Sequence, residues 1–101
     1  MTPVVWVTPH ELRQMFNAAG FDHRTRSGEV TIAIRRDAHP TTLRCPEPFC
    51  TRSQIVDYRD SSGQLLAIAH RYVRRDGTIG ASGRPDPKRM LVDGVQYATR
   101  E

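Results

Sequence analysis

Residues 7–21 read VTPHELRQMFNAAGF and contain the start, the body and the end of a helix. Thr8, Pro9 and Glu11 fit a capping box, with Thr8 at the N-cap, Pro9 at the first helical position and Glu11 at the third. Gly20 is the residue type that most often ends a helix in the left-handed conformation. Between these ends, apolar residues recur at helical spacing and form one stripe: Leu12, Met15, Phe16 and Ala19.

The rest of the chain carries patterns typical of β-structure. Apolar and polar residues alternate over residues 30–35, which predicts a half-buried strand. Residues 54–59 and 64–75 flank the turn sequence Asp60-Ser61-Ser62-Gly63 and predict a hairpin. Residues 90–92 and 95–97 flank Asp93-Gly94, a pair typical of a type I′ turn, and predict a terminal hairpin.

Two segments interrupt this pattern. Residues 36–53 contain three prolines and are expected to form an irregular loop, with a short strand at residues 41–44 as an option. Residues 80–88 read GASGRPDPK, and their glycines and prolines predict a connector without regular structure. The fold class that follows is α+β, with one N-terminal helix followed by a small, mainly antiparallel β-sheet of hairpins. A chain of 101 residues fits one domain, so we expect residues 1–101 to form a single small basic α+β domain.

Composition narrows the location of the protein. Its mean hydropathy is -0.56, and no stretch approaches the roughly 18 apolar residues that a membrane span requires. The first seven residues carry no basic side chain before their short apolar patch, which argues against a secretory signal. We therefore expect a cytoplasmic protein without a membrane partner, and reduced cysteines.

Cys45 and Cys50 are separated by four residues, and His39 lies six residues upstream. Three interpretations stay open for them: unlinked thiols in a proline-rich loop, a disulfide, or a structural zinc site. Zinc would need a fourth ligand, and there is no second cysteine pair. We expect unlinked thiols, no bound metal and no cofactor.

Positive charge is the main functional clue. The formal net charge is +4, and Lys88 is the single lysine among 15 basic residues. Arginine makes planar, two-pronged hydrogen bonds to phosphates and stacks on bases. The same preference for arginine also arises from the codon usage of a GC-rich genome, so the ratio alone does not establish phosphate contact.

The basic residues gather in the stretch HRYVRRDGTIGASGRPDPKR, residues 70–89. On a strand, His70, Tyr72 and Arg74 would share one face. Tyr72 could stack on a base, and the backbone amides of residues 80–83 could bind an anion. The predicted nucleic-acid-binding residues are Arg71, Tyr72, Arg74, Arg75, Arg84, Lys88 and Arg89. In the alternative interpretation, His70 and Tyr72 complete the core face, the arginines are solvated strand ends and residues 83–88 are a rigid connector.

The same stretch raises the question of catalysis. A metal-independent ribonuclease needs a general base, an acid and a cation for the phosphorane charge. His70 could be the base or the acid, with Arg74 or Arg84 as the cation. The second acid–base group would have to come from elsewhere, such as His23 or His39. We therefore assign no catalytic residue from the sequence and expect a non-enzymatic protein.

Two resemblances bear on these expectations. The opening ELRQMFNAAGF, with the turn and strand that follow it, resembles the front of HicA-type messenger-RNA interferase toxins, which are small basic proteins of the double-stranded-RNA-binding α-β-β-β-α type. In that family a catalytic His follows a Gly-Ser pair at the first hairpin. The matching stretch here is Arg26-Ser27-Gly28-Glu29, without the His, and no second helix is predicted to close the chain. The activity is therefore not carried over.

The second resemblance covers AHRYVRRDGTIGASGRPDPKRMLVDG, residues 69–94. It is similar to a segment of uncharacterised small basic proteins of actinobacteria and their phages, which implies a bacterial or phage origin and no particular activity. From the sequence we expect a nucleic-acid-binding module, with RNA or single strands favoured. The alternatives are an interaction or inhibitor protein that binds an acidic protein partner, and a metal-independent ribonuclease of toxin type.

Overall fold

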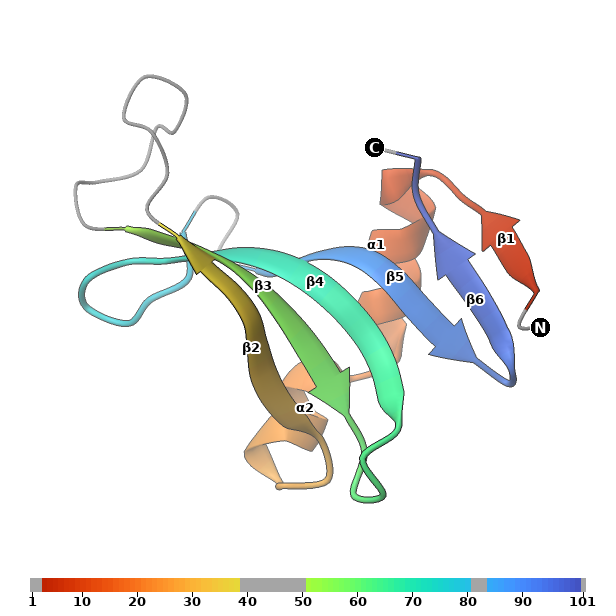
Figure 1. Cartoon of the computed structure of the whole chain (residues 1–101), viewed down its shortest axis with the longest axis horizontal. Coiled ribbons are helices and arrows are strands. Elements are labelled where there is room, and N and C mark those ends of the chain that lie inside the picture. The colour runs from red at the N-terminus through yellow and green to blue at the C-terminus, as the bar shows by residue number, and fades with distance from the viewer. Residues whose placement is uncertain (1–2, 39–50, 81–83, 101) are drawn as a thin grey trace.

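A computed structural model describes residues 3–38, 51–80 and 84–100 of the chain (Figure 1). Within these ranges it contains six strands and two helices. In chain order they are β1 (Val4–Trp6), α1 (Pro9–Ala18), α2 (Phe21–Arg26), β2 (Thr31–Ala38), β3 (Arg52–Arg59), β4 (Leu65–Val73), β5 (Asp86–Val92) and β6 (Val95–Ala98).

The strands form one curved sheet in the order β1-β6-β5-β4-β3-β2. Strands β2 to β6 pair antiparallel with their neighbours, whereas β1 pairs parallel with β6, placing Val4 beside Gln96. Figure 1 shows both helices on the same side of this sheet, and α1 packs against β5. The sheet therefore has one helix-covered face and one face that no described helix covers.

The helix start agrees with the prediction. The Thr8 hydroxyl accepts a hydrogen bond from the Glu11 amide at 3.1 Å, and the Glu11 carboxylate accepts one from the Thr8 amide at 3.3 Å. Gly20 has a φ of 68°, the left-handed conformation expected at the end of α1. A second helix, α2, begins directly after Gly20, and the sequence analysis did not predict it.

The core lies between the helices and the covered face of the sheet. Its centre is an aromatic group in which the Phe16 ring lies 4.8 Å from Phe21 and 5.3 Å from Tyr58, measured between centroids. Ala67 and Ala69 of β4 are fully buried against this layer, and their small side chains leave room for the rings. The other buried members of the cluster are Leu12, Val30, Val56 and Met90.

Both predicted short-turn hairpins are present. In the turn between β3 and β4, the Asp60 carboxylate accepts hydrogen bonds from the amides of Ser62 and Gln64. Between β5 and β6, Asp93 and Gly94 have φ values of 49° and 78°. Two consecutive positive φ angles are what a type I′ turn requires.

The α+β class is confirmed, but the predicted arrangement was wrong in three respects. First, β1 precedes the helix and pairs parallel with β6, which makes the sheet mixed. Second, there are two helical segments. Third, the sheet is not a simple series of hairpins, because residues 39–51 separate β2 from β3 and residues 74–85 separate β4 from β5. Residues 86–88, predicted to be irregular, begin β5. Pro87 is accommodated there because the β4–β5 ladder shifts register beside it.

No helix in the described part of the chain is long and apolar enough to cross a membrane. The irregular loop predicted at residues 36–53 is shorter than expected, because residues 36–38 belong to β2 and residues 52–53 to β3. The part that contains His39, Cys45 and Cys50, with the optional strand at residues 41–44, lies outside the described residues.

Candidate functional site

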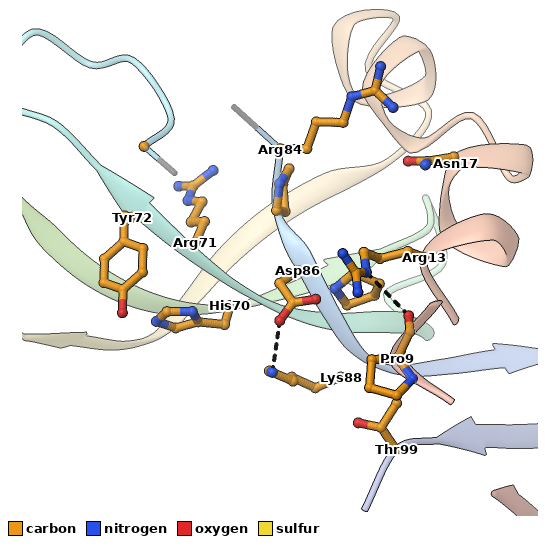
Figure 2. A pocket seen from close by; sticks show the side chains of 13 residues that line it. Pro9, Arg13, Asn17, His70, Arg71, Tyr72, Arg84, Asp86, Lys88 and Thr99 are labelled. Atoms are coloured by element: carbon orange, nitrogen blue, oxygen red, sulfur yellow. Dashed lines mark hydrogen bonds and ion pairs between the residues drawn. The ribbon is translucent and has the colours of Figure 1, made fainter. Parts of the chain in front are cut away.

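A pocket opens where β4 and β5 separate. The ladder between them ends at the pair His70 and Asp86, while β4 continues to Val73. Beyond that point β4 pairs with the segment that precedes β5: Ile79 lies opposite Val73, and the Gly80 amide donates to the Tyr72 carbonyl at 2.8 Å. The resulting pocket has a volume of about 540 Å³, and α1 contributes Pro9, Arg13 and Asn17 to its wall (Figure 2).

The pocket is strongly cationic. Its lining contains four basic side chains and one carboxylate: Arg13, Arg71, Arg84, Lys88 and Asp86. Figure 2 shows Asp86 in the middle, with Arg71 and Arg84 on one side of it and Lys88 on the other. Because the cations come from α1, β4, β5 and the segment before β5, only the folded chain brings them together.

One of these cations is paired with a carboxylate, and two are bonded to uncharged groups. Lys88 Nζ lies 2.9 Å from the Asp86 carboxylate, which offsets one charge. Arg71 Nε donates to the Gln54 side-chain oxygen at 3.0 Å, and Arg13 Nε donates to the Pro9 carbonyl at 3.4 Å. These two acceptors are uncharged, so the bonds position the guanidinium groups without neutralising them.

Several arginines outside the pocket differ from Arg13 and Arg71, because each makes an ion pair with a carboxylate. Asp57 binds two of them on the face without helices, where its carboxylate contacts Arg35 and Arg59. The other pairs are Arg24–Glu29, Arg26–Asp22 and Arg52–Asp37. Much of the arginine content therefore compensates acidic residues, whereas Arg13 and Arg71 of the pocket are bonded to uncharged acceptors.

His70 and Tyr72 form the remaining aromatic part of the lining. Their rings meet edge to face with centroids 4.7 Å apart, as expected for side chains two apart on one strand. His70 Nε2 lies 2.7 Å from the Ser53 hydroxyl of β3. Burial lowers the pKa of His70, the positive charge of Lys88 lowers it further, and Asp86 opposes the shift in part.

The structure brings together five of the eight residues that sequence reasoning selected: His70, Arg71, Tyr72, Arg84 and Lys88. The other three are not part of the pocket lining. Arg74 and Arg75 follow the end of β4 in a turn closed by the hydrogen bond from the Gly77 amide to the Arg74 carbonyl. Arg89 is exposed on β5, opposite Ile68 and Ala98.

The suggested amide cradle receives little support from the described residues. The Gly80 amide is already bonded to Tyr72, and residues 81–83 lie outside the described part of the chain. His23, a suggested second acid–base group, lies on α2 and does not line the pocket. Among the described residues, no cluster of three or more His, Cys, Asp or Glu side chains could hold a metal ion.

Sequence reasoning missed the contribution of the helix. Arg13 and Asn17 are exposed residues one turn apart on α1, beside the buried positions Leu12 and Phe16. That spacing was the only available indication, because it places both polar side chains next to the apolar stripe, where a packed helix meets its neighbours. Thr99, which follows β6, was also missed, because its contact with the Lys88 carbonyl joins segments that are distant in the sequence.

A second pocket of about 500 Å³ adjoins the first on the helix-covered face. Asn17, Arg71, Arg84 and Pro85 line both pockets. The second pocket lies over the aromatic part of the core, and burial raises the pKa of Tyr58 in its floor. Arg71 and Arg84 therefore line both recesses, and Arg26 and Asp22 add further charged groups to the second.

Comparison with known proteins identifies no relative: no protein-family model, curated protein or solved structure matches the chain. The function is therefore argued from the geometry and charge of the pocket.

Proposed function

We propose that the protein binds single-stranded nucleic acid, in particular RNA, at the cationic pocket between β4 and β5. The observation that carries this proposal is the lining of four basic side chains against one carboxylate. Nucleic-acid binding draws most of its affinity from phosphate neutralisation by such groups, with release of counterions. The formal net charge of +4 adds a long-range attraction for a polyanion.

The shape of the site favours a single strand over a duplex. The basic side chains surround a recess instead of forming a projecting ridge or a helix that could enter a groove. A single strand can bend a phosphate into such a recess, while its unpaired bases remain free to stack. Tyr72 and His70 supply aromatic rings at the margin of the recess, the type of partner on which bases stack.

The salt dependence of binding tests this proposal. A fluorescein-labelled single-stranded RNA of twelve nucleotides is titrated with the protein at several salt concentrations, and affinity is followed by anisotropy. If three to four phosphates are neutralised, a plot of log K against log salt should have a slope of about −2 to −3. Absence of binding at low ionic strength, or a slope near zero, would refute the proposal.

The same protein and labelled RNA distinguish this proposal from the two alternatives that the sequence analysis left open. If the protein binds an acidic protein partner instead, a partner should remain bound in a pull-down after nuclease treatment, while the purified RNA does not bind. If it is a metal-independent ribonuclease, the labelled RNA should be cleaved in the presence of a chelator, and His70→Ala should abolish the cleavage. Binding of intact RNA without cleavage supports the binding module.

A further inference from the structure

Three adjacent strands place a serine, a histidine and an aspartate together on the face without helices. Ser53 Oγ of β3 lies 2.7 Å from Nε2 of His70 on β4. Asp86 of β5 is the residue directly opposite His70 in the β4–β5 ladder. Residues opposite one another in a sheet project from the same face, so the carboxylate and the imidazole are neighbours.

The environment of the His70 imidazole favours its neutral form, which is the form that can act as a base. His70 is half-buried, and burial lowers its pKa below the ordinary value of 6.5. Of the charged side chains around it, Lys88 lowers the pKa and Asp86 raises it, both from β5. On the other side β3 presents the uncharged Ser53 and Ile55. The lowered pKa of His70 favours the neutral imidazole, which has a nitrogen lone pair that can accept the Ser53 proton.

We propose that Ser53 is the nucleophile, His70 the general base and Asp86 a positioning residue of a site that hydrolyses carboxylic esters carrying an anionic group. A serine hydroxyl bonded to an imidazole, with a carboxylate on the adjacent strand, provides the three groups of a serine-hydrolase triad. The Asp86 carboxylate is bonded to Lys88, so it would act on His70 through its charge. This activity goes beyond nucleic-acid binding and does not depend on it.

In the first step, Ser53 Oγ attacks the ester carbonyl carbon while His70 Nε2 takes the hydroxyl proton. The tetrahedral intermediate collapses, the bond from carbon to the leaving oxygen breaks, and His70 returns the proton to the departing alcohol. Water then attacks the acyl-serine with His70 again as the base, which releases the carboxylic acid and regenerates Ser53. The ammonium of Lys88, which lines the same pocket as His70 and lies 2.9 Å from the Asp86 carboxylate, would favour the negative charge on the intermediate.

The cationic pocket determines the substrate class. Ser53 does not line that pocket, but His70, Arg84 and Lys88 do, so an anionic group on a substrate at Ser53 would extend past His70 toward these positive charges. An ester with a carboxylate or phosphate on its acyl or alcohol part would be held there, whereas a neutral ester of the same size would gain nothing from the arginines.

Covalent labelling tests the nucleophile. The purified full-length protein is incubated with a fluorophosphonate, whose phosphorus forms a bond to the serine oxygen as fluoride leaves. Intact mass and peptide mapping should place one adduct on Ser53. Ser53→Ala should remove it, and His70→Gln should slow labelling about 100-fold or more. Ser62→Ala is the matched control, because its hydroxyl bonds the Asp60 carboxylate and no imidazole.

The pH profile of wild-type labelling needs no variant and keeps the proposal testable if His70→Gln does not fold. The rate should rise with a midpoint below 6.5, because only the neutral imidazole accepts the proton. In Asp86→Asn the midpoint should move to lower pH, since the carboxylate raises the pKa of His70. A merely structural role for Asp86 would reduce the rate and leave the midpoint unchanged.

Ester hydrolysis tests the substrate class. The ratio kcat/KM for 4-nitrophenyl hemisuccinate should exceed that for neutral 4-nitrophenyl acetate about tenfold or more, and Arg84→Gln should reduce this preference. Equal rates for the two esters would overturn the anionic substrate. An unlabelled Ser53, an adduct that persists in Ser53→Ala, or a profile without a midpoint below 6.5 would overturn the triad itself.

Discussion

Arg35 and Asp57 form a two-pronged ion pair across β2 and β3. Arg35 Nε donates to one carboxylate oxygen of Asp57 at 2.8 Å, and Nη2 donates to the other at 3.1 Å. Arg59 adds a third hydrogen bond at 3.2 Å. The Asp57 side chain is only 9% exposed, so its charge depends on these two arginines.

Asp57→Asn should lower the free energy of unfolding by about 1–3 kcal/mol, because the amide cannot accept two charge-assisted bonds from Arg35. Burial by itself would raise the pKa of Asp57, but the hydrogen bonds and charges of Arg35 and Arg59 outweigh it and lower the pKa. The contribution of the pair to stability is therefore fully present above the unfolded-state pKa near 3.8 and is lost as pH falls through the lower, folded-state pKa. Urea unfolding at pH 7 and at pH 3 should show the deficit of the variant shrinking in acid; a deficit independent of pH would contradict this account.

Thr8→Ala should destabilise the protein by about 1 kcal/mol. The threonine oxygen accepts the hydrogen bond of the Glu11 amide, and that donor would otherwise lack an intrahelical partner. Thr8→Ser keeps the acceptor and should remain close to the wild type. Thermal unfolding of the three proteins measures the difference, and equal stability of the alanine and serine variants would show that the cap contributes nothing.

The elements that were predicted correctly are those whose determinants are local. The Thr8 cap bonds a residue three positions away, and the Asp93-Gly94 turn depends on the φ angles of two residues. Such interactions can be recognised in a short window of sequence. The α2 helix was missed because glycine at position 20 is typical of a helix end. The left-handed geometry of Gly20 also permits a bend, after which Phe21 is buried in the core.

β1 shows why the remaining topology was not predictable. Its three residues, Val4, Val5 and Trp6, are exposed and too few for a recognisable alternation. They become a strand by pairing with β6 at the other end of the sequence, and nothing in the local pattern specifies this partner.

The residues of the candidate site likewise fall into those that the local sequence identifies and those that only the packing of the chain brings to the pocket. His70, Arg71 and Tyr72 were identifiable because they are consecutive, and Arg84 and Lys88 because they flank prolines in the basic stretch. Arg13 enters the pocket only because α1 packs against β5. Arg74 and Arg75 were wrongly placed on a continuing strand, since β4 ends at Val73 and the chain turns there.

Tyr72→Ala should lose about 1–3 kcal/mol of RNA-binding free energy with the slope of log K against log salt unchanged, because the ring would stack on a base and carries no charge. Tyr72→Phe should keep most of the affinity, since it keeps the ring and its edge-to-face contact with His70. Anisotropy titrations of both variants at three salt concentrations check this. A shallower slope in the alanine variant would mean that Tyr72 acts by positioning the cations and does not stack.

Two double variants that lose the same charge distinguish the contribution of the pocket to RNA binding from that of the overall positive charge. Arg13 and Arg84 are exposed residues of the pocket lining, whereas Arg75 and Arg89 are exposed residues outside it. Both pairs are replaced by glutamine. Little stability should be lost in either variant, because exposed arginines contribute little to folding, and equal melting temperatures confirm that the proteins compared are folded.

If phosphates bind in the pocket, Arg13→Gln/Arg84→Gln should make the salt slope shallower by about 1.4, which corresponds to two phosphate contacts on a single strand. Arg75→Gln/Arg89→Gln removes the same net charge and should change the slope by less than half as much, because long-range attraction between exposed charges is largely screened at physiological salt. The difference between the two variants is thus the contribution of position, with charge held constant. Equal changes in slope would mean that RNA is attracted by the overall charge of the protein, and the pocket would then have no special role in binding.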